Sequence, residues 1–434
     1  MHLTTQEIAV HNLQIGMYVS KLDVPWVQTP FPIQGFHISK QEQLDQLAIY
    51  CTKVYVDQFL SKIDVQSKLS LTPLKASKVN KLDPKIQRLM AEKARFKPSV
   101  EHYENTSKLK REVIQVGELF TQVSGQMSVI FRDMMQNGYV NIAGVRAASS
   151  EMVKSIVRNP DALAWLCRVS NENKALHEQA VRSAIWGIIF GRHLGLSKHD
   201  LRDIGTALLL APIGKCKLPR ELLFGELTNE EMEQYQEHVA LTLEETEKMF
   251  SASHQVNYIL SSYCERNNGS GYPRNLIGNR IPFLARVCGL VQHYEELINP
   301  LPGTEALTPV EAISNLYNER GNCFQTELIE SFIQAIGIYP TGSLVKLTNN
   351  AIGIVMEQPS NARLRPKVVI VKDGMNTILE KPKTINLIDN PTDRFGMPLQ
   401  IEKSLRSTSI DIDARELHDK LFAKNKWLSF LQAS

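Results

Sequence analysis

The chain has 434 residues with a formal net charge of +3, and 43% of its residues are apolar and 22% charged. This length allows two or three domains with real hydrophobic cores, and so small a charge gives no whole-chain signal for nucleic acid or membrane binding. Six cysteines without a C-x-x-C pair disfavour a zinc knuckle or a disulfide framework and favour reduced thiols. Because no apolar run approaches the roughly 18 residues of a membrane span, we expect a cytoplasmic protein without a signal peptide.

The first hundred residues are expected to form a small module followed by a linker. Over residues 1–60, short strands are indicated at 17–19, within 30–39 and at 51–57, with a helix over 40–50, which makes an α+β module. Residues 61–100 contain ten Lys or Arg against three acids. We interpret this stretch as a basic linker rather than a nucleic-acid or lipid contact, because aromatic residues are not interleaved with its charges.

The middle of the chain is predicted to be helical. Apolar residues recur three and four apart over most of residues 101–339, which indicates an all-α domain. Thr228 and Glu231 have the spacing of a capping box, so a helix is expected to begin near 229 and to continue through "EMEQYQEHVALTLEETEKMF". The long helix at 101–137 is one reason to expect a homodimer.

After Pro340 the pattern changes to that of strands. Hairpins around Asn349-Asn350 and Asp373-Gly374 predict a small β extension over 340–390. Residues 391–434 are expected to be a polar tail that ends in an amphipathic helix. The apolar residues of that helix should dock on the protein or on a second copy rather than insert into a membrane; they are Leu417, Leu421, Trp427 and Phe430.

The most specific stretch is residues 264–287, where Gly269, Gly271, Tyr272 and Pro273 predict a rigid loop between two helices. Together with "IGK" at 213–215, "LPRELL" and "LTNEEMEQYQEHV", it resembles an HD-GYP domain, the cyclic di-GMP phosphodiesterase branch of the HD superfamily. The resemblance has its core at about 160–339. Residues 11–57 resemble the uncharacterised domain that often precedes HD-GYP in bacterial proteins, and 340–388 resemble that subfamily's C-terminal extension. The expected fold class is therefore mainly α: an HD-superfamily helical domain with a small α+β N-terminal module and a small β C-terminal extension.

The resemblance implies a centre of two or three iron or manganese ions held by His and Asp side chains. Counted from the fixed landmarks, the seven ligand positions fall on Gln179, Ala211, Pro212, His238, Tyr263, Cys264 and Gln292. Only His238 keeps a family ligand, and the Asp that precedes the Gly-x-Gly-Tyr-Pro loop is Asn268. Because Ala and Pro offer no donor and amides carry no charge, we predict a degenerate site without metal, cofactor or catalytic residues.

Two other interpretations of this cavity stay open. His177, His238, Cys264 and His293 lie at or near old ligand positions, so a rebuilt metal site would make the protein a cyclic di-GMP phosphodiesterase with a remodelled centre. Against it, His177 is two residues from Gln179 and so lies on another face of its helix. Alternatively, the protein has left cyclic di-GMP behind altogether and serves as an interaction protein.

Lys215 and Arg266 are the candidate nucleotide-binding residues. Lys215 matches the family lysine that reaches a substrate phosphate, although a cation there also suits a helix C-terminus. The family's basic segment after the last Asp is replaced by "INPLPGTEAL". The resemblance further implies that the Gly-Tyr-Pro loop, with Tyr272 as anchor, meets diguanylate cyclase (GGDEF) domains. We expect a pseudoenzyme: a catalytically inactive regulator or scaffold in cyclic di-GMP signalling that works by protein contacts or by sensing the nucleotide.

Overall fold

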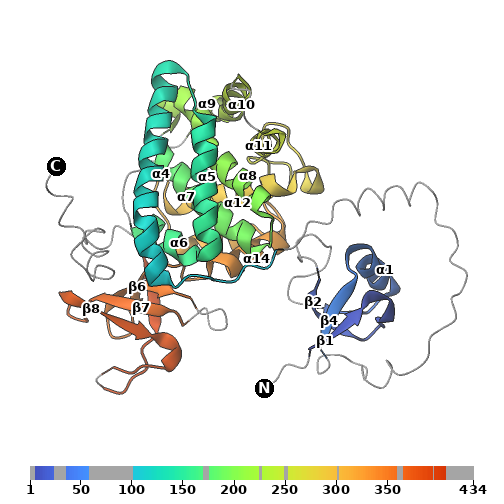
Figure 1. Ribbon diagram of the computed structural model, residues 1–434, viewed down its shortest axis with the longest axis vertical. Helices are drawn as coiled ribbons and strands as arrows, with labels where there is room; N and C mark the ends of the chain where they lie inside the picture. The colour runs from blue at the N-terminus through green and yellow to red at the C-terminus, as the bar shows by residue number, and fades with distance from the viewer. Residues whose placement is uncertain are drawn as a thin grey trace, which may run out of the picture. The chain divides into compact units, whose positions relative to one another are not determined.

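The computed structural model describes residues 5–23, 36–57, 101–169, 175–223, 227–248, 253–300, 303–358, 365–393 and 395–406. They divide into two compact units, one formed by residues 1–102 with 194–197 and the other by the rest of the chain (Figure 1). The predicted basic linker at 61–100 and the predicted C-terminal amphipathic helix lie outside the described residues. No helix in the described ranges combines the length and the apolar character that crossing a membrane would require.

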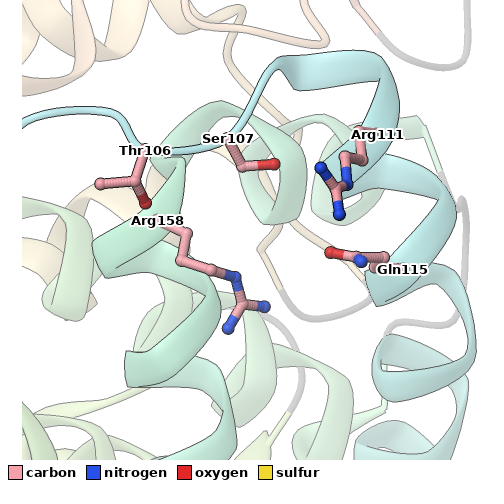
Figure 2. A pocket seen from close by; sticks show the side chains of 5 residues that line it. All are labelled: Thr106, Ser107, Arg111, Gln115 and Arg158. Carbon is pink, nitrogen blue, oxygen red and sulfur yellow. The ribbon is translucent and has the colours of Figure 1, made fainter.

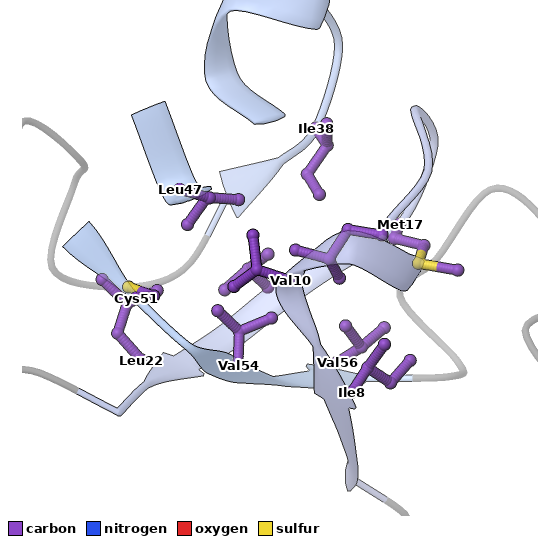
Figure 3. Close-up of a cluster of buried hydrophobic side chains, with 11 residues drawn as sticks. Ile8, Val10, Met17, Leu22, Ile38, Leu47, Cys51, Val54 and Val56 are labelled. Atoms are coloured by element: carbon purple, nitrogen blue, oxygen red, sulfur yellow. The ribbon is translucent and has the colours of Figure 1, made fainter. Parts of the chain in front are cut away.

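The N-terminal unit contains an antiparallel sheet with the strand order β1-β4-β2-β3. Its elements are β1 (Thr5–Ala9), β2 (Tyr18–Leu22), β3 (Phe36–His37), α1 (Gln41–Tyr50) and β4 (Lys53–Asp57). The helix and the strands expected at 17–19 and 51–57 are confirmed, whereas β1 was not predicted. Figure 3 shows the apolar cluster that the sheet and α1 enclose, in which Val19, Leu47 and Val54 are 0% exposed.

The second unit contains the helices that the periodicity predicted, followed by the C-terminal sheet. They are α4 (Leu109–Asn137), α5 (Ile142–Arg158), α6 (Pro160–Val169), α7 (Leu176–His193), α8 (Lys198–Leu210), α9 (Asn229–Gln236), α10 (His238–Lys248), α11 (His254–Leu260), α12 (Phe283–Ile298), α13 (Pro309–Asn318) and α14 (Thr326–Ile336). Helix α7 is buried from Gln179 to Gly191 and packs against α8, α12, α4 and α5. The expected fold class, mainly α with small terminal sheets, is confirmed.

The predicted helix start near 229 is correct, but the helix is not continuous. The Thr228 hydroxyl accepts a hydrogen bond from the Glu231 N–H at 3.3 Å, and α9 begins at Asn229. The chain turns at Glu237, so that α9 and α10 replace the single helix expected through 250. This break lies directly before His238. The carbonyl oxygen of His238 is the atom that a Cβ at Gly214, in the turn after α8, would approach most closely.

The C-terminal sheet is antiparallel with the order β8-β7-β6-β5-β9. Its strands are β5 (Leu344–Leu347), β6 (Ile352–Glu357), β7 (Lys367–Lys372), β8 (Ile378–Asn386) and β9 (Ile401–Leu405). Both predicted hairpins are present. The polar tail predicted over 391–434 is wrong for β9, which pairs with β5 at the edge of the sheet. An edge strand needs few apolar side chains, because its backbone hydrogen bonds hold it in place.

Candidate functional site

The turn after α8 approaches α10 so closely that only glycine fits at its centre. This turn is a short 3-10 helix, η3 (Ile213–Lys217). The Gly214 N–H donates to Thr242 Oγ1 at 3.0 Å, and a Cβ at Gly214 would lie 2.0 Å from the His238 carbonyl oxygen. Real Cβ atoms do not come so near a backbone oxygen, so Gly214 is what allows η3 and α10 to pack here. The contact brings Lys215 and His238 into one buried site.

Lys215 does not extend into solvent from this turn. Its side chain is 3% exposed, and Nζ lies 3.2 Å from Glu296 Oε1 and 5.3 Å from the centre of the Tyr235 ring. Burial alone would lower the pKa of the Lys215 ammonium, but Tyr235 and the Glu296 carboxylate raise it more. Lys215 is therefore a permanent cation inside the site, with an internal ion pair and a cation–π contact.

Glu296 carries the matching negative charge. Its Oε1 also accepts a hydrogen bond from Gln292 Nε2 at 3.2 Å. Burial tends to raise the pKa of the Glu296 carboxyl, but the Lys215 charge and the Gln292 hydrogen bond lower it further, so the net shift is downward. The carboxylate is thus ionised at neutral pH, and the pair is balanced in charge.

His238 is held between two tyrosines. It is 1% exposed, its Nε2 lies 3.2 Å from the Tyr272 hydroxyl, and its Nδ1 lies 3.4 Å from the Tyr263 hydroxyl. Burial, reinforced by the charge of Lys215, lowers the pKa of His238 well below its ordinary value. The Tyr263 hydroxyl donates to the Ala211 carbonyl at 3.3 Å. Neutral imidazole, with one donor and one acceptor, satisfies this arrangement if Nδ1 donates to Tyr263 and Nε2 accepts from Tyr272.

The Gly-Tyr-Pro loop is fixed from within. A Cβ at Gly271 would lie 2.3 Å from the backbone nitrogen of Arg266, so the loop folds tightly onto the backbone of Glu265 and Arg266. The Glu265 carboxylate accepts the backbone N–H groups of Arg274 and Leu276 at 2.8 and 2.9 Å. A rigid loop was expected. Its Tyr272, expected to be an amphipathic anchor, is partly buried and has its hydroxyl 3.2 Å from His238 Nε2.

Arg266 is also engaged internally. Its Nη1 donates to the Glu265 carbonyl at 3.1 Å and to the Tyr263 carbonyl at 3.4 Å, and its guanidinium lies 5.0 Å from the centre of the Phe324 ring. The two cations predicted to bind a nucleotide, Lys215 and Arg266, are therefore both used in contacts within the protein.

The side chains at the seven positions that the resemblance matches to metal ligands do not fit a pair of transition-metal ions. Ala211 contributes only its carbonyl, which already accepts from Thr242 and Tyr263, and Pro212 has no side-chain donor. Cys264 is 7% exposed, and burial raises the pKa of its thiol, which disfavours the thiolate that binds metals. Gln179 and Gln292 offer neutral amides, both 5% exposed or less. Apart from His238, no side chain at these positions is a usual ligand of iron or manganese in its neutral-pH form.

The histidines of the alternative metal site have other neighbours. The His177 ring meets Phe131 edge-on at 6.2 Å between centroids, and His293 Nε2 lies 3.1 Å from Glu319 Oε2. Within the described ranges, no three His, Cys, Asp or Glu side chains gather as a metal site would need.

Two members of the site, Tyr235 and Glu296, were not predicted from the sequence. The sequence offered only spacing as an indication. Tyr235 precedes His238 by three residues and Glu296 follows Gln292 by four, and residues so spaced are neighbours on the surface of a helix. Nothing in the sequence indicated that α12 would meet η3, 81 residues away.

A separate hollow of about 480 Å³ lies at the start of α4 (Figure 2). It is lined by Thr106, Ser107, Arg111, Gln115 and Arg158. The Arg158 guanidinium is paired with the fully buried Glu112 at 2.6 Å, so this cation too has an internal partner. None of the residues predicted for the site lines this hollow.

Comparison with protein families gives two matches. Residues 168–328 match the HD domain, and residues 5–145 match a domain of unknown function, DUF3391. The second match extends beyond the 1–60 module that the sequence suggested and includes all of α4 and the start of α5.

Several characterised proteins are similar to this chain. The cyclic di-GMP phosphodiesterase PA4108 of Pseudomonas aeruginosa is 26% identical over 84% of this chain and 84% of its own length. The cyclic di-GMP phosphodiesterase response regulator RpfG of Xanthomonas campestris is 30% identical over 35% of this chain and 41% of its own length. Among solved structures, the HDG"Y"P protein Bd1817 of Bdellovibrio bacteriovorus matches 76% of this chain and 98% of its own, with 15% identity and a TM-score of 0.43.

Proposed function

Because this chain is an HD-domain protein with an N-terminal DUF3391 domain, we propose that it is a catalytically inactive regulator in cyclic di-GMP signalling that acts through protein contacts. The signalling context is supported by relatives that are cyclic di-GMP phosphodiesterases, one of them similar over most of both chains. The loss of catalysis is supported by the buried site itself.

The observation that carries the proposal is the internal ion pair between Lys215 and Glu296, at 3.2 Å. Two divalent ions would bring four positive charges into the cavity. The carboxylate that we find there is already neutralised by Lys215, and the same ammonium acts on His238, the one retained family ligand. A pair of divalent ions would therefore have to displace Lys215 from Glu296 before that carboxylate could balance their charge.

Protein contact is favoured over nucleotide sensing because of where the cations are. Phosphate groups are usually bound by arginine and lysine side chains with free donors. Lys215 and Arg266 instead donate to Glu296 and to backbone carbonyls. The Gly-Tyr-Pro loop, by contrast, leaves several side chains exposed, including Ile277 at 57%.

A hydrolysis assay tests the loss of catalysis. The purified full chain is incubated with cyclic di-GMP and Mn²⁺, or with Fe²⁺ under anaerobic conditions, and products are separated by chromatography. PA4108 from Pseudomonas aeruginosa, prepared in parallel, serves as the active control. We expect no product above the metal-only blank. The alternative is a phosphodiesterase with a remodelled metal centre, and it is favoured by the relatives that are cyclic di-GMP phosphodiesterases. It would replace our proposal if hydrolysis of cyclic di-GMP depended on metal and disappeared in His238→Ala.

A binding experiment tests the contact surface. The full chain is used to capture purified diguanylate cyclase (GGDEF) domains, and Ile277→Asp is compared with the unmodified protein. Tyr258→Asp is the matched control, because Tyr258 is 52% exposed but lies on α11 rather than in the loop. We expect capture to fall about tenfold with Ile277→Asp and to be unchanged by the control. Equal capture by all three proteins would remove the loop as the contact.

A further inference from the structure

Helix α4 has one face that the described residues of its unit leave exposed. Its inner side is buried against α5, α6 and α7, with Val116, Val123 and Met127 at 3% exposure or less. On the outer side, seven residues three or four apart are all exposed, and we call them the α4 stripe: Ile114, Glu118, Thr121, Gly125, Val129, Arg132 and Gln136. Figure 1 shows α4 along the margin of the helices.

The α4 stripe is symmetric about its central residue. The intervals on either side of Gly125 are 4, 3 and 4 residues, so residues whose numbers add to 250 lie at equal distances from the centre. If two copies of α4 pack antiparallel with Gly125 at the crossing, Glu118 of each copy faces Arg132 of the other, and Thr121 faces Val129. Within one helix, Glu118 and Arg132 are about 21 Å apart along the axis and cannot pair with each other.

Gly125 supports this arrangement independently. Glycine in the middle of a helix costs about 1 kcal/mol relative to alanine. A Cβ added at Gly125 would meet nothing within 4 Å, so the packing of the chain itself does not require glycine there. Close approach of another helix backbone does require a small residue, and Thr121 on the same stripe is also small.

The apolar residues of the stripe lie away from the crossing. Ile114 is 53% exposed and Val129 is 43% exposed, which leaves two branched apolar side chains in water on each copy. Pairing would cover them while bringing two Glu–Arg pairs together. A parallel pair would instead place like charges opposite each other, at Glu118 and again at Arg132, which is unfavourable.

We infer that α4 is a self-association surface, on which a second copy of this chain packs its own α4 antiparallel across Gly125. The surface combines few apolar side chains with exposed charges, so the dimer is a reversible one. The inference is independent of the proposed function, because the α4 stripe contains no residue of the site around His238.

Sedimentation velocity on the full chain, over a range of concentrations, tests the inference. We expect a monomer–dimer equilibrium for the unmodified protein. Gly125→Glu places a charged side chain at the crossing, in space that is open in the single chain, so the fold should be kept while dimerisation weakens at least about tenfold. Gln126→Glu is the matched control, since Gln126 is an exposed neighbour on α4 outside the stripe, and it should leave the equilibrium unchanged.

The charge register has its own test. Glu118→Arg and Arg132→Glu should each weaken the dimer about tenfold, because like charges then face each other, and the double exchange should restore it. A Gly125→Cys variant should form a disulfide between copies on mild oxidation. The inference is overturned by a full chain that stays monomeric at high concentration, by a dimer that Gly125→Glu does not weaken, or by a double exchange that does not recover.

Discussion

The core of the N-terminal sheet and the site around His238 both bury side chains, but the residues that they bury differ in kind. In the N-terminal cluster the enclosed side chains are apolar apart from one thiol, and Leu47 and Val54 are 0% exposed (Figure 3). The site around His238 encloses an ammonium and an imidazole, with Glu296 and two phenols as their partners. An apolar core needs only volume and contact, whereas every buried polar group needs a partner in the right place.

The difference lies in the polar groups that the helical site buries. Its ammonium, imidazole and carboxylate have partners within the protein, whereas the buried Oε1 atoms of Gln179 and Gln292 have no hydrogen-bond partner among the described residues. The stability of the first region should therefore depend on packing alone, and that of the second on particular partners and on pH.

The largest effect is expected from a cavity in the N-terminal core. Leu47→Ala should lower the free energy of unfolding of this unit by about 3 kcal/mol, equally at pH 7 and pH 5.5, because only apolar contacts are lost. Hydrogen exchange of the amides in β4 measures this loss. Ile49→Ala, on the same helix but 55% exposed, is the control and should change little. If the decrease in the free energy of unfolding differed between pH 7 and pH 5.5, a titrating group would contribute to the stability of the cluster.

A smaller effect is expected from breaking the internal ion pair. Lys215→Met keeps the volume of the side chain but leaves Glu296, which is 37% exposed, without its cation. The free energy of unfolding in urea should fall by about 2 kcal/mol, less than for a fully buried charge because water still reaches the carboxylate.

Two further variants decide whether the pairing itself is responsible. Adding Glu296→Gln to Lys215→Met should recover at least half of the loss, because no unpaired charge is then left. Lys154→Met, which removes an exposed partner of Glu151, should cost less than about 0.5 kcal/mol. If the double variant is as unstable as the sum of its single changes, the pair does not balance charge as we describe.

The smallest effect concerns pH. Burial and then Lys215 lower the folded-state pKa of His238, so below pH about 6.5 the unfolded chain binds a proton that the folded chain does not. Stability should therefore fall as the pH decreases, by about 1 kcal/mol between pH 7 and pH 5.5. His238→Asn should be less stable at pH 7 but should lose this part of the pH dependence. Urea unfolding of both proteins at both pH values measures this. If the free energy of unfolding falls equally with pH in the unmodified protein and in His238→Asn, His238 is not the group responsible.

The sequence predicted those parts of the fold that depend on local pattern. Helical periodicity indicated the helices, and the capping residue Thr228 placed the start of α9 correctly. The edge strands β1 and β9 were missed because each is short and rich in polar residues. Their positions are set by hydrogen bonds to β4 and β5, which are distant in sequence.

The contacts of the site could not be predicted from the sequence. Comparison with family motifs indicated which ligand positions hold Ala211, Pro212 and Gln292. It did not show that Lys215 would meet Glu296, because that contact depends on how α12 packs against η3. The inward direction of Tyr272 was likewise hidden, since it depends on the fold of the loop and on the location of His238.

Metal content tests the central claim most directly. The full chain is loaded with excess Mn²⁺ or with Fe²⁺ under anaerobic conditions, freed of unbound metal by gel filtration, and measured by plasma mass spectrometry beside PA4108 from Pseudomonas aeruginosa treated in the same way. Since Lys215 and Glu296 already balance the charge of the cavity, we predict far less than one ion per chain. Two ions retained per chain, and lost in His238→Ala, would contradict this account.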